Sequence, residues 1–381
     1  MKRKNYDFII CGGGASGMLL ALHLLQDSFF EKHRILIIDK DSKTTNDRTW
    51  CFWEKEAGPL EHLVRYSWHQ AKFQSAEIQQ NLNLKPYTYK MIRGIDLYQY
   101  ALPLLKNSKQ IDWLEATISN LESDMNQTLV HTEKGTFASS RVFSSLYNPE
   151  RVVHQKKYPV LQQHFVGWIV ETENNCFDPE QITFMDFDVP QANATRFMYV
   201  LPFSPNKALL EDTFFSAKLL PKEDYEDAIR AYLKKIGAGR YTCLEKEAGS
   251  IPMTAYPFQQ HNTSHLLHIG TAGGWTKAST GYTFQQTLRQ TQRLVQFLKH
   301  NTPLHQFYKW DKFSFYDMLF LDVLEKHNTR GADLFTMMFR NNPIHRILRF
   351  LDNKTNFIED LKIMRSFPLG WFLKALWKRL T

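Results

Sequence analysis

The chain contains few cysteines and no long hydrophobic run, and each shortage excludes a class of protein. Among its 381 residues are four cysteines, Cys11, Cys51, Cys176 and Cys243, which lie far apart and form no C-x-x-C pair. Neither a disulfide framework nor a cysteine zinc site is indicated, and a reducing compartment fits best. The longest apolar runs, such as residues 18–22, fall far below the roughly 20 residues that cross a bilayer. We expect a globular protein that does not span a membrane.

The sequence also lacks the patterns of export, of nucleic-acid binding and of metal binding. The first apolar run, residues 8–11, ends at glycines before it reaches the length of a secretory signal, so we expect a cytoplasmic protein. Lysine and arginine (47) exceed aspartate and glutamate (39), a net charge of +8, but they are scattered, so no nucleic acid is predicted as a partner. His261 and His265 have no third ligand near them in the sequence, and we predict no metal site.

Cations are concentrated only near the C-terminus, in residues 371–380 (WFLKALWKRL). Aromatic and aliphatic residues alternate there with lysine and arginine at roughly helical spacing. This pattern is typical of a helix that lies on an anionic membrane surface, and equally typical of a C-terminal helix docked on its own domain. Both interpretations stay open at this point.

A glycine-rich turn follows the first predicted strand, residues 6–11. Its glycines, spaced as G-x-G-x-x-G, are Gly12, Gly14 and Gly17. A predicted helix over residues 16–26 and a second apolar strand over residues 34–39, which ends in Asp39, complete a βαβ unit in outline. The flanking strand, helix and terminal acid favour nucleotide binding over a fortuitous glycine turn.

Each residue type in this motif has a physical reason. Gly12 permits the tight turn, Gly14 lets backbone N–H groups approach a pyrophosphate, and Gly17 lets the helix pack closely on the strand. Asp39 can accept hydrogen bonds from ribose hydroxyls, which favours FAD or NAD over NADP in this groove. The motif by itself does not distinguish FAD from NAD.

The middle of the chain is predicted to be mostly extended. The expected strands cover residues 165–170, 182–187, 197–201 and 208–215, which fits a sheet-based second domain. Residues 225–236 predict an amphipathic helix, and residues 94–106 predict a helix interrupted by Pro103. The last 80 residues, rich in Phe, Leu, Met and Arg, predict further helices.

A second glycine-rich turn comes after a short apolar strand at residues 266–269. Its residues are Gly270, Thr271, Ala272 and Gly273, and a further glycine, Gly281, precedes a predicted helix that runs to residue 297. Free backbone donors at such a helix start suit the pyrophosphate or the pyrimidine carbonyls of a flavin. An ordinary connection between a strand and a helix is the alternative.

These motifs, taken together, resemble the lycopene β-cyclase family of flavoproteins over nearly the whole chain. Besides the first glycine motif, the resemblance rests on residues 47–53, 91–94, 163–168, 185–187, 249–253 and 270–284, which follow in the family's order. It implies an α/β fold with a Rossmann-like FAD-binding domain of the glutathione-reductase-like type. The implied limits are a discontinuous FAD domain (1–150 and 245–300), a sheet-based substrate domain (151–244) and a C-terminal helical region (301–381).

The resemblance also implies a function. Members use reduced FAD, with NADPH or a similar donor, yet transfer no net electrons, because lycopene and its ring-closed products γ-carotene and β-carotene are isomers. The expected enzyme is therefore an isomerase acting by acid–base chemistry on the ψ ends of lycopene and related carotenoids. Since such hydrocarbons lie in the bilayer, we expect a peripheral protein on the inner face of the membrane. The sequence predicts no oligomeric state.

The family's acidic motif, usually FLEET, is similar to residues 209–213 (LLEDT). The family's proposed proton donor falls on Glu211, whereas Asp212 replaces a second glutamate and is one methylene shorter. On a regular strand these two side chains point to opposite faces, so we select Glu211 as the residue that faces the substrate. An apolar cleft would raise the pKa of this carboxyl and keep it protonated. Without the resemblance, the pair would be interpreted as a solvated strand edge.

Aromatic rings are the expected partners of the cation formed by protonation, because a ring face attracts positive charge. The candidates are Trp50, Phe52, Trp53, Trp275 and Tyr282. Residues 50–53 are equally typical of a hydrophobic core. Thr271 stands where related flavin hydroxylases carry an aspartate, so only backbone contacts to the flavin are implied there.

Three other interpretations fit the first glycine motif. They are a flavin monooxygenase that hydroxylates an apolar substrate, a flavin reductase that saturates isoprenoid double bonds, and a flavin-binding protein without enzymatic activity. Stoichiometry separates the enzymes, because a cyclase needs only catalytic reductant and no oxygen.

Overall fold

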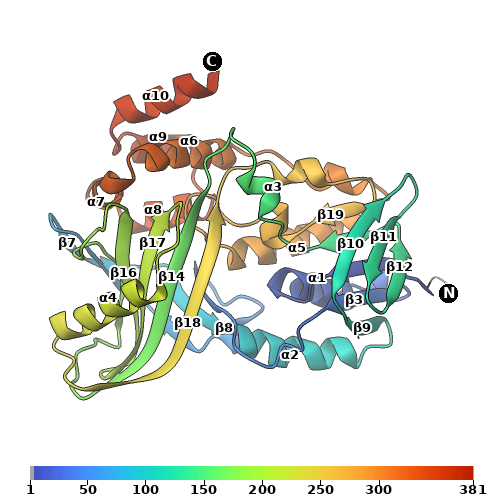
Figure 1. Ribbon diagram of the computed structural model, residues 1–381, viewed down its shortest axis with the longest axis horizontal. Coiled ribbons are helices and arrows are strands. Elements are labelled where there is room, and N and C mark those ends of the chain that lie inside the picture. The colour runs from blue at the N-terminus through green and yellow to red at the C-terminus, as the bar shows by residue number, and fades with distance from the viewer. Residues whose placement is uncertain (1–3, 381) are drawn as a thin grey trace.

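A five-stranded parallel sheet organises one half of the protein (Figure 1). The computed structural model describes residues 4–380, with side chains from Tyr6 onward. The strands, in the order they lie side by side, are β19 (Leu266–His268), β13 (Val142–Ser144), β2 (Phe8–Cys11), β3 (Ile35–Asp39) and β9 (Ile111–Glu115). Because β19 comes from far along the chain, this half is assembled from two separate stretches of sequence.

Both faces of this sheet are covered, which explains why β2 and β3 are apolar at every position before Asp39. Helices pack on one face, and a four-stranded sheet packs on the other. The helices are α1 (Ala15–Gln26), α2 (Gly94–Lys106) and α5 (Phe284–Leu298). The four-stranded sheet contains β1 (Lys4–Asn5), β12 (Gly135–Ser139), β11 (Thr128–Thr132) and β10 (Ile118–Ser123).

The predicted βαβ unit is confirmed, with strand and helix bounds within one or two residues of the prediction. The predicted interruption of α2 at Pro103 is wrong, because the helix continues to Lys106. Pro103 lies in the last turn, so its missing N–H removes one hydrogen bond near the helix end, where unsatisfied carbonyls are normal.

A seven-stranded sheet forms the second half, and its strands are long and strongly paired. In spatial order they are β18 (Tyr241–Met253), β14 (Leu161–Thr172), β17 (Lys207–Ser216), β16 (Thr195–Ser204), β15 (Gln181–Asp186), β6 (Gln70–Gln74) and β7 (Gln79–Asn83). The four strands expected between residues 165 and 215 are confirmed as β14 to β17. Helix α4 (Lys222–Lys235) packs on one face of this sheet, here called the helix face (Figure 1).

The pairing of two segments differs from the predicted domain limits. Strands β6 and β7 come from the stretch assigned to the nucleotide domain, and β18 extends across residue 245, yet all three belong to the seven-stranded sheet. The physical reason is that strand pairing joins segments that are distant in sequence, which a linear division cannot represent. A smaller sheet, β4 (Thr49–Glu54), β8 (Thr88–Arg93) and β5 (Tyr66–Trp68), lies between the halves.

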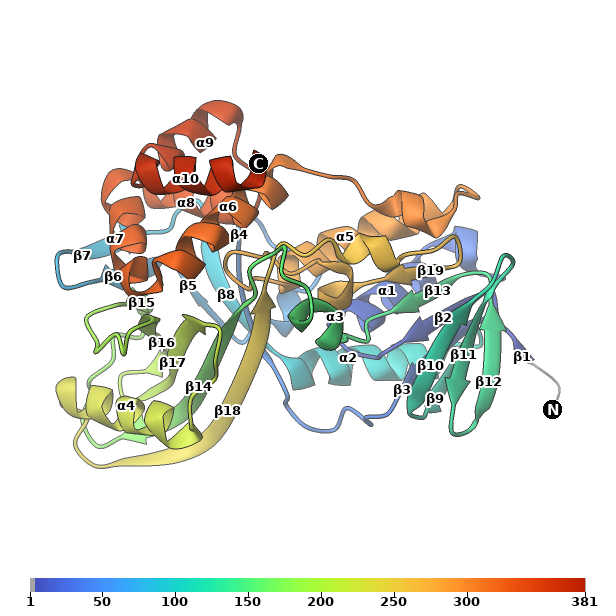
Figure 2. The same ribbon diagram turned by 45° about the horizontal axis from the view of Figure 1, so that its top comes forward.

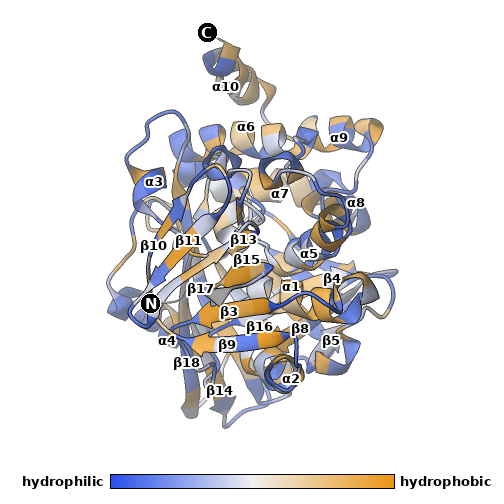
Figure 3. Cartoon of the chain, turned by 90° about the vertical axis from the view of Figure 1, so that its right-hand side faces the viewer, coloured by the Kyte–Doolittle hydropathy of each residue, from blue (hydrophilic) through white to orange (hydrophobic). Residues whose placement is uncertain are grey.

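The C-terminal region is helical, as predicted, and packs partly against the other face of the seven-stranded sheet, here called the cavity face. Its helices are α6 (Lys312–Lys326), α7 (Gly331–Asn341), α8 (Ile344–Leu351), α9 (Phe357–Met364) and α10 (Leu369–Leu380). Figure 2 shows α9 and α10 together at the top of the molecule, and in Figure 3 α10 stands out from the body. Between residues 4 and 380, no helix combines the length and apolarity needed to cross a bilayer.

Short helices complete the chain. They are α3 (Glu150–Val153) and the 3₁₀ turns η1 (Ser28–Phe30), η2 (Glu61–Leu63), η3 (Phe258–His261), η4 (Gly270–Gly273), η5 (Leu304–Phe307) and η6 (Asn328–Arg330). Of these, η4 contains the second glycine-rich turn and positions part of the site.

Candidate active site

A cavity of about 660 Å³ lies where the two halves meet. Its wall combines the start of α1, the second glycine turn, strand β4 and the cavity face of the seven-stranded sheet, with side chains of α7 closing one end. We call it the central cavity. Its size lies in the range of small-molecule and cofactor sites.

The first glycine motif has the geometry that the sequence predicts. Gly12 has φ +100°, and a Cβ added there would lie 2.1 Å from the Ser145 Oγ. A Cβ on Gly17 would lie 2.0 Å from the carbonyl oxygen of Gly12, so α1 packs on the turn only with glycine there. A Cβ on Gly14 would meet no atom within 4 Å, which leaves open space in front of α1.

The start of α1 fits an anionic group. Gly14 is the N-cap residue, no side chain among the described residues caps this end, and its first turn carries no acid. Backbone N–H groups therefore point into the open space at Gly14, where a pyrophosphate would find donors. The residues present thus fit a dinucleotide cofactor.

Asp39 lies beside this turn at the carboxyl end of β3. Its Oδ2 accepts a hydrogen bond of 2.5 Å from the Gly13 N–H, and its Oδ1 accepts one of 2.7 Å from the Asp41 N–H. Lys43 Nζ lies 3.5 Å from Oδ2. The structure therefore brings Asp39 to the glycine motif, while its predicted role toward a ribose stays a prediction.

The second glycine turn adjoins the first. Gly270 has φ +60°, and a Cβ there would lie 2.6 Å from the Oγ of Ser16 on α1. A Cβ on Gly273 would lie 2.2 Å from the His268 carbonyl oxygen, and Ala272 is buried. Thr271 lines the central cavity and its Oγ1 lies 3.2 Å from that of Thr276.

Gly281 connects this turn to the second half of the molecule. It has φ +73°, and a Cβ there would lie 2.1 Å from the Oε1 of Gln163 on β14. Gly281 and Gly270 both line the central cavity. The structure thus brings Gly14 of the first motif and Gly270, Thr271 and Gly281 of the second to one cavity, while the other predicted cofactor residues lie outside its lining. Their contacts with a cofactor stay predictions.

Glu211 lies on the cavity face at the middle of β17 and lines the central cavity. It is opposite Tyr199 on β16 and opposite Gly167 on β14. Burial is the largest cause that raises the pKa of Glu211 well above its ordinary value, followed by the charge of Glu247 and a hydrogen bond with it. The protonated acid is therefore the favoured form of Glu211 in this cavity.

Asp212 points the other way, into the helix face under α4. It is fully buried, and Arg196 donates two hydrogen bonds of 2.8 Å to it, from Nε to Oδ1 and from Nη2 to Oδ2. Burial raises the pKa of Asp212, and the Arg196 guanidinium opposes that rise. The structure does not bring Asp212 into the central cavity, because strand alternation places it on the opposite face from Glu211.

The five aromatic candidates separate into two groups. Trp50 and Tyr282 line the central cavity with Glu211. Phe52, Trp53 and Trp275 are buried in hydrophobic clusters and border a second cavity, of about 400 Å³. The Trp53 indole also donates a 3.2 Å hydrogen bond to the Leu348 carbonyl oxygen.

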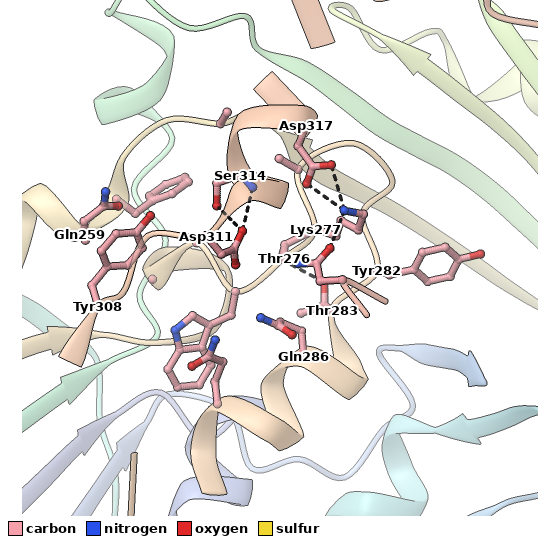
Figure 4. A pocket seen from close by; sticks show the side chains of 18 of the residues that line it. Gln259, Thr276, Lys277, Tyr282, Thr283, Gln286, Tyr308, Asp311, Ser314 and Asp317 are labelled. Atoms are coloured by element: carbon pink, nitrogen blue, oxygen red, sulfur yellow. Dashed lines mark hydrogen bonds and ion pairs between the residues drawn. The ribbon is translucent and has the colours of Figure 1, made fainter. Parts of the chain in front are cut away.

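Tyr282 lies on the rim of both cavities, and Figure 4 shows it at the edge of the second one. That cavity contains a buried ion pair, in which Lys277 Nζ contacts the two Asp317 oxygens at 2.9 and 3.2 Å (Figure 4). Lys277 also donates to Asn353 Oδ1 at 2.8 Å. Because Lys277 follows the second glycine turn and Asp317 is on α6, this network joins the turn to the C-terminal helices.

Several cavity residues were not predicted from the sequence. The main ones are Glu247 and the ring-bearing residues Tyr89, Phe184, Phe197, Tyr199, Phe335 and Phe339. Gly167 does not line the cavity, but it is paired with both Glu211 and Glu247. Gly167 lies in a stretch that carries the family resemblance, but no role was assigned to it. Alternation along residues 241–253 is the one signal for Glu247, and it becomes informative only once the pairing of β18 with β14 is known.

The chain has the α/β fold of flavoproteins, with a parallel sheet and C-terminal helices. The same fold occurs in a geranylgeranyl bacteriochlorophyll reductase-like protein from Thermoplasma acidophilum, at TM-score 0.67 and 11% identity, over 95% of this chain and 96% of that one. It occurs also in a flavoprotein/dehydrogenase from Cytophaga hutchinsonii, at TM-score 0.61 and 12% identity, over 96% and 100% of the chains. The predicted fold class is confirmed.

The chain belongs to the lycopene cyclase family, whose model, described as lycopene cyclase protein, matches residues 7–375. A lycopene beta-cyclase from Pantoea ananas is 24% identical over 98% of this chain and 97% of its own length. The family predicted from the residue pattern is thereby confirmed. Its members are enzymes that catalyse cyclisation, and this chain is an enzyme of that family.

Proposed function

We propose that this protein is a lycopene β-cyclase that closes the ψ ends of lycopene to β rings by acid–base chemistry. The observation that carries the proposal is Glu211, a carboxyl favoured in its protonated form within a cavity walled by aromatic rings. Family membership supports the substrate class.

In the proposed reaction, the Glu211 carboxyl gives its proton to the terminal double bond of the ψ end. The tertiary cation that results is attacked by the C5–C6 double bond, which forms the ring. Loss of the C6 proton restores a neutral product, so one proton enters and one leaves, and no electrons are transferred. Trp50 and Tyr282 lie where their ring faces can stabilise positive charge.

The cofactor proposed for the central cavity is FAD. Gly12, Gly14, Gly17 and Asp39 would hold its adenosine and pyrophosphate side, while the backbone of residues 270–273 and Gly281 would lie along the flavin. The reduced flavin, obtained from NADPH or a similar donor, would supply negative charge beside the cation. The open space at Gly14 and the uncapped start of α1 support this assignment.

We also propose that the enzyme lies on the inner face of the cytoplasmic membrane, through an apolar surface on α9 and α10. Its exposed residues, which we call the apolar ridge, are Phe357, Ile358, Leu361, Leu369, Leu373, Trp377 and Leu380. Exposed Lys362 and Lys374 lie beside them, which suits anionic lipid. The other side of α10 is docked on the protein, where Arg379 pairs with Asp322. Docking of one side leaves the exposed side available for the proposed membrane contact.

An apolar cavity lies among the C-terminal helices. It has about 210 Å³ and is lined mainly by side chains of α6 to α10, including Phe372, Leu373 and Leu376. It shares Phe335 and Met338 with the central cavity, so the two cavities are neighbours. This arrangement supports entry of a bilayer hydrocarbon toward Glu211.

A liposome assay tests the ridge. Leu373→Glu should weaken binding to anionic vesicles at least about tenfold, because a charge replaces a side chain that gains about 1.5–3 kcal/mol on burial. Met125→Glu is the control, because Met125 is also apolar and is even more exposed, at 93% against 62% for Leu373, but lies in the β10–β11 turn. Equal binding of both variants and the unmodified protein would contradict the membrane proposal.

An anaerobic incubation tests the reaction itself. Purified protein, FAD, sub-stoichiometric chemical reductant and lycopene in liposomes should yield a ring-closed product of unchanged mass, in excess of the reductant. Chromatography and mass spectrometry measure this directly. A product that gains hydrogen in step with reductant, or that appears only with oxygen, would identify a reductase or a monooxygenase instead.

A further inference from the structure

A second glutamate, Glu247 on β18, faces Glu211 across one intervening strand. Gly167 on β14 is paired with Glu211 on one side and with Glu247 on the other. Residues directly opposite in neighbouring antiparallel strands share a face, so all three form one row on the cavity face. With strands about 4.8 Å apart, the two glutamate side chains can meet only above Gly167.

Gly167 leaves room for that meeting. A Cβ added there would lie 3.0 Å from the Cγ of Glu211, 3.0 Å from the Cγ of Glu247 and 3.2 Å from the Oε1 of Glu247. Any larger residue would therefore push the two carboxyl groups apart. The backbone of Gly167 has ordinary strand geometry, which any residue can adopt. Glycine is therefore required here by the close approach of the Glu211 and Glu247 side chains.

The two oxygens of Glu247 have different surroundings. Thr49 Oγ1 donates to Glu247 Oε2 at 2.7 Å. The other oxygen, Oε1, is buried and accepts no hydrogen bond from the described residues. A buried carboxylate oxygen without a partner is costly. The Glu211 side chain approaches the same space above Gly167, and its protonated carboxyl can supply the missing proton.

The other ionisable groups around Glu211 are neutral or paired. Cys51 on β4, Tyr89 on β8, Tyr199 on β16 and Tyr282 face the same part of the cavity, and burial raises the pKa of each. Farther along β18, Glu245 is paired with Arg93 of β8 at 2.5 Å. Glu247 is therefore the neighbouring acid that raises the pKa of Glu211, after burial.

We propose that Glu247 is a positioning residue that shares one proton with Glu211 above Gly167 and so keeps Glu211 in its acid form at neutral pH. This inference rests on the proposed role of Glu211 as proton donor. When Glu211 protonates the substrate, the pair becomes two adjacent carboxylates. Their mutual repulsion favours recovery of a proton, and the proton released from C6 restores the singly protonated pair.

The pH profile of cyclisation tests this. Activity should fall at high pH as Glu211 ionises, and Glu247→Gln should move that fall to lower pH by about one unit or more, because the like charge is removed. Activity at low pH should remain. A purely structural role would lower activity at every pH without moving the profile. Glu171→Gln, an exposed carboxyl on β14, is the control and should leave the profile unmoved.

A second measurement does not depend on lycopene. In pH-difference infrared spectra of the full-length protein with FAD, a protonated-carboxyl C=O band should be absent in Glu211→Gln. In the unmodified protein it should titrate above neutral pH, and in Glu247→Gln at lower pH. An unchanged midpoint would overturn the role of Glu247. A shifted midpoint without cyclisation by any variant would instead refute the proposed function alone.

A further variant keeps the proposal testable if Glu247→Gln fails to fold. Gly167→Ala keeps both glutamates but separates them, so the infrared midpoint should again fall. If both Glu247→Gln and Gly167→Ala leave the midpoint where it is, the proton is not shared.

Discussion

The two faces of the seven-stranded sheet give adjacent acids opposite roles. On the cavity face, Glu211 has no cation partner among the described residues, and its protonated form is favoured. On the helix face, Asp212 is ion-paired with Arg196 at 2.8 Å and surrounded by apolar side chains beneath α4. Adjacent residues on a strand point to opposite faces of the sheet, so their side chains have different neighbours. The protonation and the role of each acid therefore depend on the face it occupies.

The largest expected effect is on activity at the cavity face. Glu211→Gln should lower cyclisation about 10²–10⁴-fold, because general acid catalysis contributes that much. FAD should still bind, since Glu211 belongs to β17 and to neither glycine motif. Product formation per bound flavin is the measurement. Retained turnover would remove Glu211 from the proposed mechanism.

On the helix face the expected effect is on stability. Asp212→Asn should lower the free energy of unfolding by about 3–5 kcal/mol, because the Arg196 charge is left buried without its partner. Turnover per folded molecule should stay near that of the unmodified protein. Urea unfolding and activity at low temperature measure the two quantities. If Asp212→Asn kept the unfolding free energy of the unmodified protein but lost cyclisation, Asp212 would have a role in catalysis and not in stability.

The cavity face also predicts a dependence of stability on pH. Burial, and then Glu247, raise the pKa of Glu211 above its value in the unfolded chain, so folding favours the protonated form. That stabilisation is complete below about pH 4, where an ordinary glutamate ionises, and is lost as pH rises through the folded-state pKa. Glu211→Gln should therefore lose less stability toward alkaline pH. Unfolding curves that stay parallel at every pH would contradict this.

The smallest expected effect is on stability, at two buried tyrosines, one on each face of the sheet. Tyr199 bonds Tyr89 through their hydroxyls at 2.8 Å on the cavity face, and the Tyr232 hydroxyl donates to Asp186 at 3.0 Å beneath α4. Replacing either tyrosine with Phe should cost about 1–2 kcal/mol of unfolding free energy. Only Tyr199→Phe should also change turnover. Equal turnover of the two variants would show that the Tyr199 hydroxyl is not needed for cyclisation.

Much of the nucleotide half could be predicted because its signals are local. The strand before Gly12, the start of α1 and the position of Asp39 follow from glycine spacing, apolar runs and helix sterics within about 35 residues. The separation of Glu211 and Asp212 was equally predictable, since alternation on a strand is a property of the backbone.

The domain limits and the far wall of the cavity could not be predicted in the same way. Strand β6 pairs with β15, so that Gln70 lies opposite Gln181, and β7 joins the sheet through β6. Strand β18 pairs with β14, so that Tyr241 lies opposite Thr172. No local pattern records such distant partners. Likewise, Phe52, Trp53 and Trp275 looked like substrate contacts, but the tertiary packing places them in clusters beside a second cavity.

By itself, the sequence determined the family, the glycine motifs and which of two adjacent acids faces the cavity, because short-range sterics and alternation act between near neighbours. Only the tertiary structure decided that Glu247 lies opposite Glu211 and that Asp212 meets Arg196. Both contacts depend on the register between strands, which is set when long-range pairing buries the two faces together.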